Sequence, residues 1–231
     1  MILPFTNQFA RFMEKLIPER ASVYTRKLDS VLLEDTDLAL NAVQSTISTL
    51  SIALFLHVNA ILGDTLRGAR ADLDELQSAL NDTHAYADRL KPKSAEGAEW
   101  ERLLNMFHTL DHLQRLHERC EEDEERAITA RDTAELAEEC SLLINSIGSI
   151  VNDIEANNWL KAAEKAKDTA AKIHIKVRPY RRSVMAGIAG GTFDVYLGTG
   201  KLEAIRWLRR VSKHIERITE HVQLSVQASG K

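Results

Sequence analysis

The sequence contains few of the residues that build disulfide frameworks, tight turns and sheets. Its 231 residues include 2 cysteines, 4 prolines and 10 glycines, and only 6% of them are aromatic. Cys120 and Cys140 do not form a CxxC motif, so they indicate reduced core residues rather than a disulfide framework or a zinc site. With abundant Ala, Leu, Glu, Lys and Arg, this composition is typical of a helical protein rather than a sandwich or a barrel.

A long apolar run is also missing. No stretch reaches the ~18 to 20 uninterrupted apolar residues that a membrane-spanning helix needs. The nearest candidate, residues 50–62, contains Ser51, His57 and Asn59 and is interpreted as one face of a buried helix. The N-terminus lacks the continuous apolar segment and the small-residue cleavage site of a signal peptide. We therefore expect the isolated chain to be soluble.

Residues 1–34 are predicted to form an amphipathic, membrane-proximal segment and a linker. Placed on a helix, the large apolar side chains near the N-terminus share one stripe. The candidate docking residues of this stripe are Phe5, Phe9, Phe12 and Met13. Such a stripe is suited to the interface of a bilayer or to a protein partner.

Acidic residues are scarce in the last third of the chain. The formal net charge is −4, yet residues 160–231 contain 15 Lys and Arg against 6 Asp and Glu. The most basic stretch runs from Lys172 to Arg182, and two interpretations stay open, a solvated surface or contact with anionic lipid. The sequence has no nucleic-acid recognition motif and no interleaving of aromatic and basic residues, so no nucleic acid partner is expected.

Apolar residues recur in the sequence at spacings of three and four, which is the pattern of amphipathic helices. The predicted helices lie at residues 36–62, 66–90, 98–126, 136–154, 160–178 and 201–226. Pro179 is expected to bend or break the fifth helix. The glycine-bearing stretch 187–200 is expected to connect that helix to the sixth.

The same order of long and short connections occurs twice. The apolar spacings of the fourth predicted helix match those of the first at an offset of 93 residues. We predict an all-α fold of six long antiparallel helices, built as two pseudo-symmetric three-helix repeats. The first repeat covers residues 35–128 and the second covers residues 129–231.

Two octets in the third and sixth predicted helices contain the candidate site. HLQRLHER starts at His112 and HIERITEH starts at His214, and they share a histidine, an arginine and a glutamate at equivalent positions. In the second octet, Glu216 and Glu220 lie one turn apart on the flank of the helix. Adjacent carboxylates repel each other, and a bound cation would remove that repulsion. Their oxygen atoms suit Mg, Mn, Ca or iron.

In the first octet the corresponding pair is Gln114 and Glu118, with Asp111 one turn earlier. The candidate metal ligands are therefore Glu216, Glu220, Glu118 and Asp111. The alternative is a solvated helix flank on which Arg217 and Arg115 relieve the repulsion between carboxylates. These residues could thus hold a divalent metal or iron, or no cofactor at all.

The remaining motifs do not indicate an enzyme. GTGK (Gly198 to Lys201) lacks the first glycine and the final Ser or Thr of a phosphate-binding loop, so helix entry explains it better. The eight histidines are scattered along the sequence, and no nucleophile elbow occurs. We therefore expect a non-catalytic protein.

The sixth predicted helix resembles the third helix of a PhoU-type repeat. The similarity lies in AIRWLRRVSKHIERITEH (Ala204 to His221), where the family has a carboxylate pattern of the form E/D-x-x-x-D. Two further segments, LPFTNQFARFMEKLIPER (Leu3 to Arg20) and KLDSVLLEDTDLAL (Lys27 to Leu40), are similar to the region that leads into the PhoU-like tail of bacterial Na/Pi cotransporter family proteins.

This resemblance implies a six-helix, two-repeat bundle tied to phosphate uptake and its signalling, with carboxylate motifs that can bind metal. The family pattern falls on Glu216 and Glu220, and on Gln114 and Glu118 in the first repeat, where Gln114 departs from it by lacking a charge. The resemblance also implies a regulatory domain on the cytoplasmic side of the cell membrane. Its partner would be the membrane core of the transporter, in the same parent chain or as a separate subunit. A free-standing metal-binding bundle, a plain helical scaffold and a homodimer stay open as alternatives.

Overall fold

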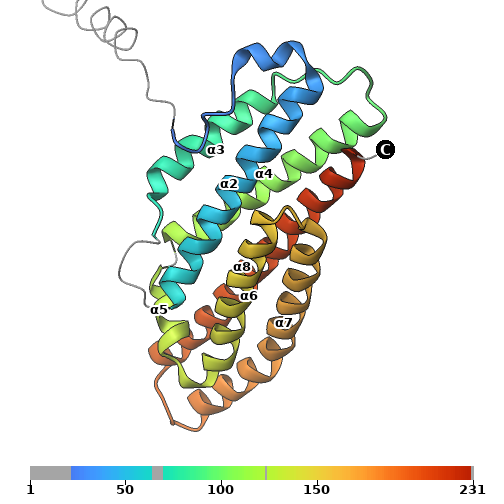
Figure 1. Ribbon diagram of the computed structural model, residues 1–231. Coiled ribbons are helices and arrows are strands. Elements are labelled where there is room, and N and C mark those ends of the chain that lie inside the picture. The colour runs from blue at the N-terminus through green and yellow to red at the C-terminus, as the bar shows by residue number, and fades with distance from the viewer. Residues whose placement is uncertain (1–21, 64–69, 123, 230–231) are drawn as a thin grey trace, which may run out of the picture.

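The protein folds as a helical bundle. The computed structural model describes residues 22–63, 70–122 and 124–229, and within these ranges it contains seven α-helices, two short 3-10 helices and no strand (Figure 1). The 3-10 helices are η1 (Ser30–Glu34) and η2 (Ala134–Leu136). The α-helices are α2 (Thr36–Leu62), α3 (Leu73–Ala87), α4 (Ala98–Glu122), α5 (Glu124–Asp132), α6 (Ala137–Glu155), α7 (Trp159–Ala189) and α8 (Val195–Ser229). The predicted all-α class is confirmed.

Short polar side chains define where several of these helices begin. Asp35 accepts a hydrogen bond from the backbone N–H of Leu38 at the start of α2, and Asp72 caps α3 in the same way. Asn158 caps α7, and Asp194 accepts a bond from the N–H of Leu197 at the start of α8. Each cap satisfies a backbone donor that has no partner within its own helix.

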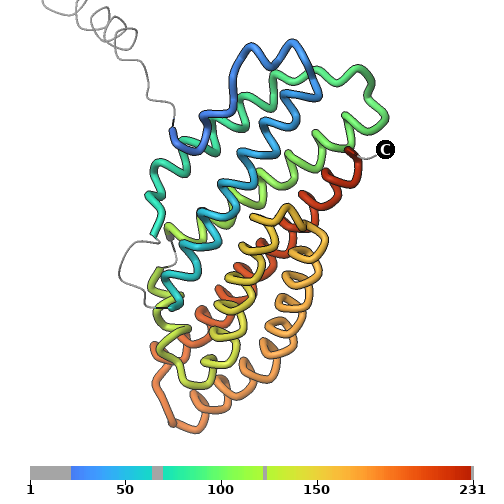
Figure 2. Tube along the Cα trace, in the orientation of Figure 1, coloured from blue at the N-terminus to red at the C-terminus, as the bar shows by residue number. Residues whose placement is uncertain are grey.

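The helices pack around one continuous apolar core. α2 contacts α3, α4, α5 and α6, while α8 lies between α4 and α7 and also contacts α5. Figure 2 shows α4 and α8 running side by side for most of their length. Leu50, Leu54 and Ile147 are fully or almost fully buried, and the core includes side chains from all seven α-helices.

α2 is the one helix in the described part of the chain that is long and apolar enough to cross a membrane. In its most apolar stretch, 61% of the residues are buried inside the bundle. A helix of this length and composition also occurs in the cores of soluble proteins.

The predicted reduced state of the cysteines agrees with the structure. Cys120 and Cys140 are both buried and free. Burial raises the pKa of Cys120 to about 12 and that of Cys140 to about 11, so both thiols stay protonated at neutral pH.

The described residues of the predicted third helix, 98–126, are all helical, but they belong to two helices. α4 ends at Glu122, and a separate helix, α5, follows from Glu124 to Asp132 and packs on α8. The redirected chain buries Ala127 and Ala130. Two small residues are a weak apolar signal beside the acidic run that precedes them, so periodicity did not reveal this helix. The described chain therefore has seven α-helices instead of six, and the predicted repeat boundary at residue 128 falls inside α5.

Of the two outcomes predicted for Pro179, a bend or a break, the break is wrong, because α7 continues through this residue to Ala189. Proline removes the bond that its N–H would have donated to the carbonyl four residues earlier. Here that carbonyl belongs to Ile175, whose exposed fraction is 72%, and Pro179 is itself exposed. Water can therefore satisfy the freed carbonyl, and the ring does not disturb the core.

The last helix begins earlier than predicted, at Val195 instead of Lys201. Gly198 thus lies inside the first turns of α8, where it is buried, and a Cβ atom at this position would overlap the side chain of Ile188. Its role is close packing of α8 against the end of α7 rather than helix entry. The second predicted helix is shorter than expected, since α3 covers residues 73–87, and residues 64–69 lie outside the described ranges.

Candidate functional site

The two octets lie on α4 and α8 and face each other in antiparallel register. Three pairs of residues define the register. They are Asn105 with His221, His112 with His214, and Arg119 with Trp207. Contacts advance by seven residues, about two turns, along each helix, which is the spacing of coiled-coil packing. Apolar residues of the octets, such as Leu113 and Ile218, are fully buried beside these contacts.

In the second octet, each predicted metal ligand is paired with a cation from its own helix. Glu216 Oε2 lies 2.7 Å from Lys213 Nζ, and Glu220 Oε2 lies 2.6 Å from an Arg217 guanidinium nitrogen. These i,i+3 pairs remove the repulsion that a bound cation would otherwise relieve. A metal ion at Glu216 and Glu220 would have to displace both pairs.

The predicted ligands in and just before the first octet also lie beside cations of their own helix. Asp111 pairs with Arg115 at 3.0 Å, and Glu118 lies 3.8 Å from Arg119. Across the described ranges, no three His, Cys, Asp or Glu side chains are grouped so that they could hold a metal ion. The carboxylate metal site stays a prediction from the sequence.

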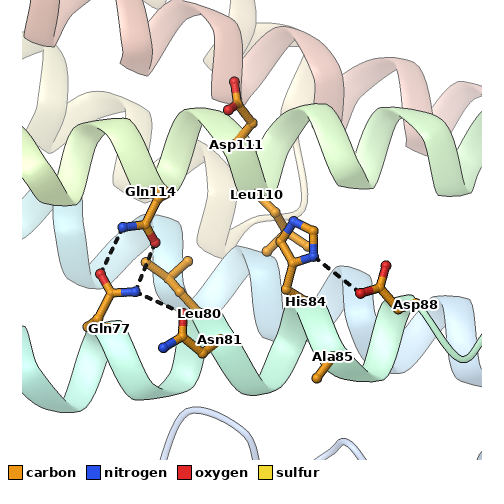
Figure 3. A pocket seen from close by; sticks show the side chains of 9 residues that line it. All are labelled: Gln77, Leu80, Asn81, His84, Ala85, Asp88, Leu110, Asp111 and Gln114. Atoms are coloured by element: carbon orange, nitrogen blue, oxygen red, sulfur yellow. Dashed lines mark hydrogen bonds and ion pairs between the residues drawn. The ribbon is translucent and has the colours of Figure 1, made fainter.

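Gln114, the residue that interrupts the carboxylate pattern, has a structural partner on α3. Its Nε2 donates to Oε1 of Gln77 at 2.8 Å, and Gln77 Nε2 donates back at 3.0 Å and also contacts Asn81. Figure 3 shows these amides facing each other between α3 and α4, beside a shallow pocket of about 510 Å³. Asp111 points away from the amide pair. A carboxylate at position 114 could not donate the return bond, which explains the amide.

Four of the eight histidines meet at the α4–α8 interface, although the sequence suggested that they were scattered. The ring centroids of His108 and His221 are 5.0 Å apart, those of His112 and His214 are 5.6 Å apart, and His112 stacks on His221 at 5.8 Å. His221 Nδ1 lies 3.0 Å from Oδ1 of Asn105. The signal in the sequence was the i,i+4 spacing of His108 and His112 opposite the i,i+7 spacing of His214 and His221.

Burial decides the charge of this histidine cluster. It lowers the pKa of His112 and His221, and it lowers the pKa of His214 to about 4. The neighbouring histidines and the guanidinium groups of Arg115, Arg119 and Arg217 act in the same direction, while the carboxylates of Asp111 and Glu220 oppose them. These three histidines are therefore neutral at pH 7.

The basic stretch Lys172 to Arg182 lies on α7. Lys172 pairs with Asp168 at 2.6 Å and Lys176 with Glu139 at 3.2 Å. The three arginines of this stretch are exposed and have no ion pair within the described part of the chain. They are Arg178, Arg181 and Arg182. Exposed apolar side chains lie on the same helix and at the start of α8, namely Ile175, Met185, Val195, Tyr196 and Leu197. The other predicted docking residues, Phe5, Phe9, Phe12 and Met13, lie outside the described residues.

The carboxylate prediction can be tested by elemental analysis. If Glu216 and Glu220 bind a metal, the purified chain should contain about one equivalent of a divalent metal or iron, and the double variant E216A/E220A should lose it. The matched control is E138A/E155A, which removes two exposed carboxylates from α6. A metal-free chain, or equal metal content in all three proteins, would eliminate the site.

Comparison of this chain with protein-family models, with curated proteins and with solved structures found no match.

Proposed function

We propose that the chain is a non-catalytic, PhoU-like regulatory domain of sodium-dependent phosphate transport that works at the cytoplasmic face of the membrane. The observation that best supports this proposal is how the helices are paired. The first long helix of each predicted repeat contacts the other, α2 with α6, and the third of each does the same, α4 with α8. Such pairing of equivalents is what two related repeats facing each other would produce.

The register of the octets supports the same proposal. His112 and His214 are equivalent positions in the two octets, and their Nδ1 atoms lie 3.4 Å apart. Equivalent residues touch each other where a two-fold axis passes between them. This contact supports a pseudo-two-fold axis between the two histidines, and in this proposal α5 is an addition to the first repeat.

We propose that α7 provides the surface of the domain that faces the membrane. Exposed arginines beside exposed apolar side chains form a surface suited to anionic lipid headgroups, since each basic residue near such a surface contributes about 1 kcal/mol of attraction. Together with the N-terminal apolar stripe, this surface would hold the domain beside the membrane core of a transporter.

Vesicle sedimentation tests this docking. The chain should sediment with vesicles of phosphatidylglycerol and phosphatidylcholine but not with phosphatidylcholine alone. The triple variant R178E/R181E/R182E should bind the anionic vesicles at least tenfold more weakly, because three attractive charges become repulsive. Its control is R26E/R89E/K91E, which changes charge equally at exposed residues elsewhere. Equal binding of both variants would contradict docking through α7.

The link to phosphate transport needs a test in the cell. In the organism that encodes the chain, deleting it should change sodium-dependent uptake of labelled phosphate, and complementation with the intact chain should restore uptake. Unchanged uptake at both low and high phosphate would overturn the regulatory role. That outcome would leave the plain helical scaffold as the better description.

A further inference from the structure

A groove of about 680 Å³ lies between α7 and α8, on the surface of the bundle. Its α7 side contains Lys167, Ala170, Ala171 and Ile175, which share one helix face because they are spaced by three and four residues. Adjacent alanines leave the groove open, since neither has a side chain that could fill the space beside α8. From Lys167 to Ile175 the groove wall extends about 12 Å along α7, at 1.5 Å per residue.

The α8 side of the groove is cationic. It contains the cations Arg209, Arg210 and Lys213 and the neutral ring of His214, with Glu216 as the one acidic residue among those that line the groove. Glu216 is already held by Lys213 at 2.7 Å. Among the residues that the structure describes, no carboxylate forms a salt bridge with Arg209, Arg210 or, from the α7 side, Lys167.

Unpaired cations gathered around one concave space raise the local concentration of anions. Arginine in particular matches a phosphate group, because the guanidinium fork can donate two parallel hydrogen bonds to its oxygen atoms. Between these cations, Ala170, Ala171 and Ile175 offer an apolar floor, and His174 is the one further polar residue of α7 that lines the groove. The volume falls within the range of about 300 to 1,000 Å³ that is typical of small-molecule sites.

We propose that this groove binds a small organic phosphate, with the phosphate group between Arg209, Arg210 and Lys167 and the apolar part of the molecule on the floor formed by α7. The proposal does not depend on the role in phosphate transport, and it concerns different residues from the exposed arginines of α7. Inorganic phosphate alone would satisfy the cations but leave the floor uncovered.

Isothermal titration with three soluble probes tests the proposal. 1-Naphthyl phosphate has both a phosphate group and an apolar ring system. Inorganic phosphate has only the charge, and 1-naphthol has only the apolar rings. We expect 1-naphthyl phosphate to bind one site at least tenfold more tightly than either of the others. Equal affinity for inorganic phosphate would overturn the role of the apolar floor, and absence of binding would overturn the site.

Variants locate the binding. R209A/R210A should weaken the binding of 1-naphthyl phosphate at least tenfold, whereas R26A/R89A, which removes the same charge from exposed residues outside the groove, should leave it unchanged. Circular dichroism of each variant confirms that the helices are retained. If the two double variants bind equally, or if binding is detected only with phosphatidylglycerol vesicles, the groove is not the site.

Glu216 provides a variant that should strengthen binding. E216Q removes the carboxylate that competes for Lys213, so the affinity for 1-naphthyl phosphate should rise about threefold or more. The same substitution would weaken a metal ion held by the predicted carboxylate site, which separates the two hypotheses. A fall in affinity for the phosphate probe in E216Q would contradict the proposed charge balance of the groove.

Discussion

Replacing Trp207 by alanine is expected to lower the free energy of unfolding by about 3 to 5 kcal/mol, the range for removing a buried aromatic side chain. Trp207 on α8 has an exposed fraction of 1%, and its indole N–H donates to the backbone carbonyl of Arg119 at 3.0 Å. That carbonyl lies near the C-terminal end of α4, so the bond joins the two helices across their interface. The alanine variant would therefore leave a cavity and lose the hydrogen bond between α8 and α4.

Urea unfolding followed by circular dichroism measures this loss. W207F keeps most of the ring volume and removes the donor, so it should cost about 1 kcal/mol for the hydrogen bond, plus a smaller packing term. W100A is the matched control, because Trp100 is 40% exposed at the start of α4 and its removal should cost much less. A loss below about 1 kcal/mol for W207A would show that the α4–α8 contact contributes little to stability.

Lowering the pH from 7 to 5 is expected to destabilise the protein through the histidine cluster. The pKa of His214 falls from 6.5 in the unfolded chain to about 4 in the folded protein because the ring is buried beside other histidines. A group whose folded pKa is lowered binds fewer protons when folded, so its contribution is present above pH 6.5 and is lost as the pH falls toward 4. At about 1.4 kcal/mol per pH unit, His214 alone accounts for about 2 kcal/mol between pH 7 and pH 5.

The lowered pKa values of His112 and His221 act with the same sign and add to this effect. Urea unfolding gives the free energy of unfolding at pH 7 and at pH 5. In H214Q, the difference between these two values should be about 2 kcal/mol smaller than in the unmodified protein. The control is H174Q, since His174 lies exposed on α7 away from α4, and this variant should keep the full difference. If H214Q and H174Q respond to acid equally, the cluster is not the acid-sensitive element.

The positions of the main helices could be predicted because burial imposes a period on the sequence. The apolar spacings of residues 36–62 and 136–154 define the core faces of α2 and α6, and Asp35 marks where α2 begins. The predictions differ from the structure where tertiary packing or solvent exposure outweighed a rule based on local sequence. Pro179 leaves an unpaired carbonyl that water can reach, Gly198 packs against Ile188, and α5 is held by two small residues whose apolar signal is weak.

Some features of the candidate site could likewise be predicted from the sequence, and others could not. The sequence predicted that the two octets are equivalent, and it placed Glu216 and Glu220 on one helix flank, which follows from the helical turn alone. Its alternative interpretation, in which arginines relieve the repulsion, agrees with the pair of Arg217 and Glu220, but the pair of Lys213 and Glu216 was not foreseen, because it depends on the rotamers that the packed helices allow.

By itself, then, the sequence determined the helical class and the spacing of the core residues, since both follow from the periodicity of one chain segment at a time. Only the tertiary structure decided which segments face each other. It brought His108, His112, His214 and His221 together across α4 and α8. It also paired Gln77 with Gln114 and opened a cationic groove between α7 and α8. Contacts between helices distant in sequence depend on the antiparallel register of their packing, which no single helix encodes.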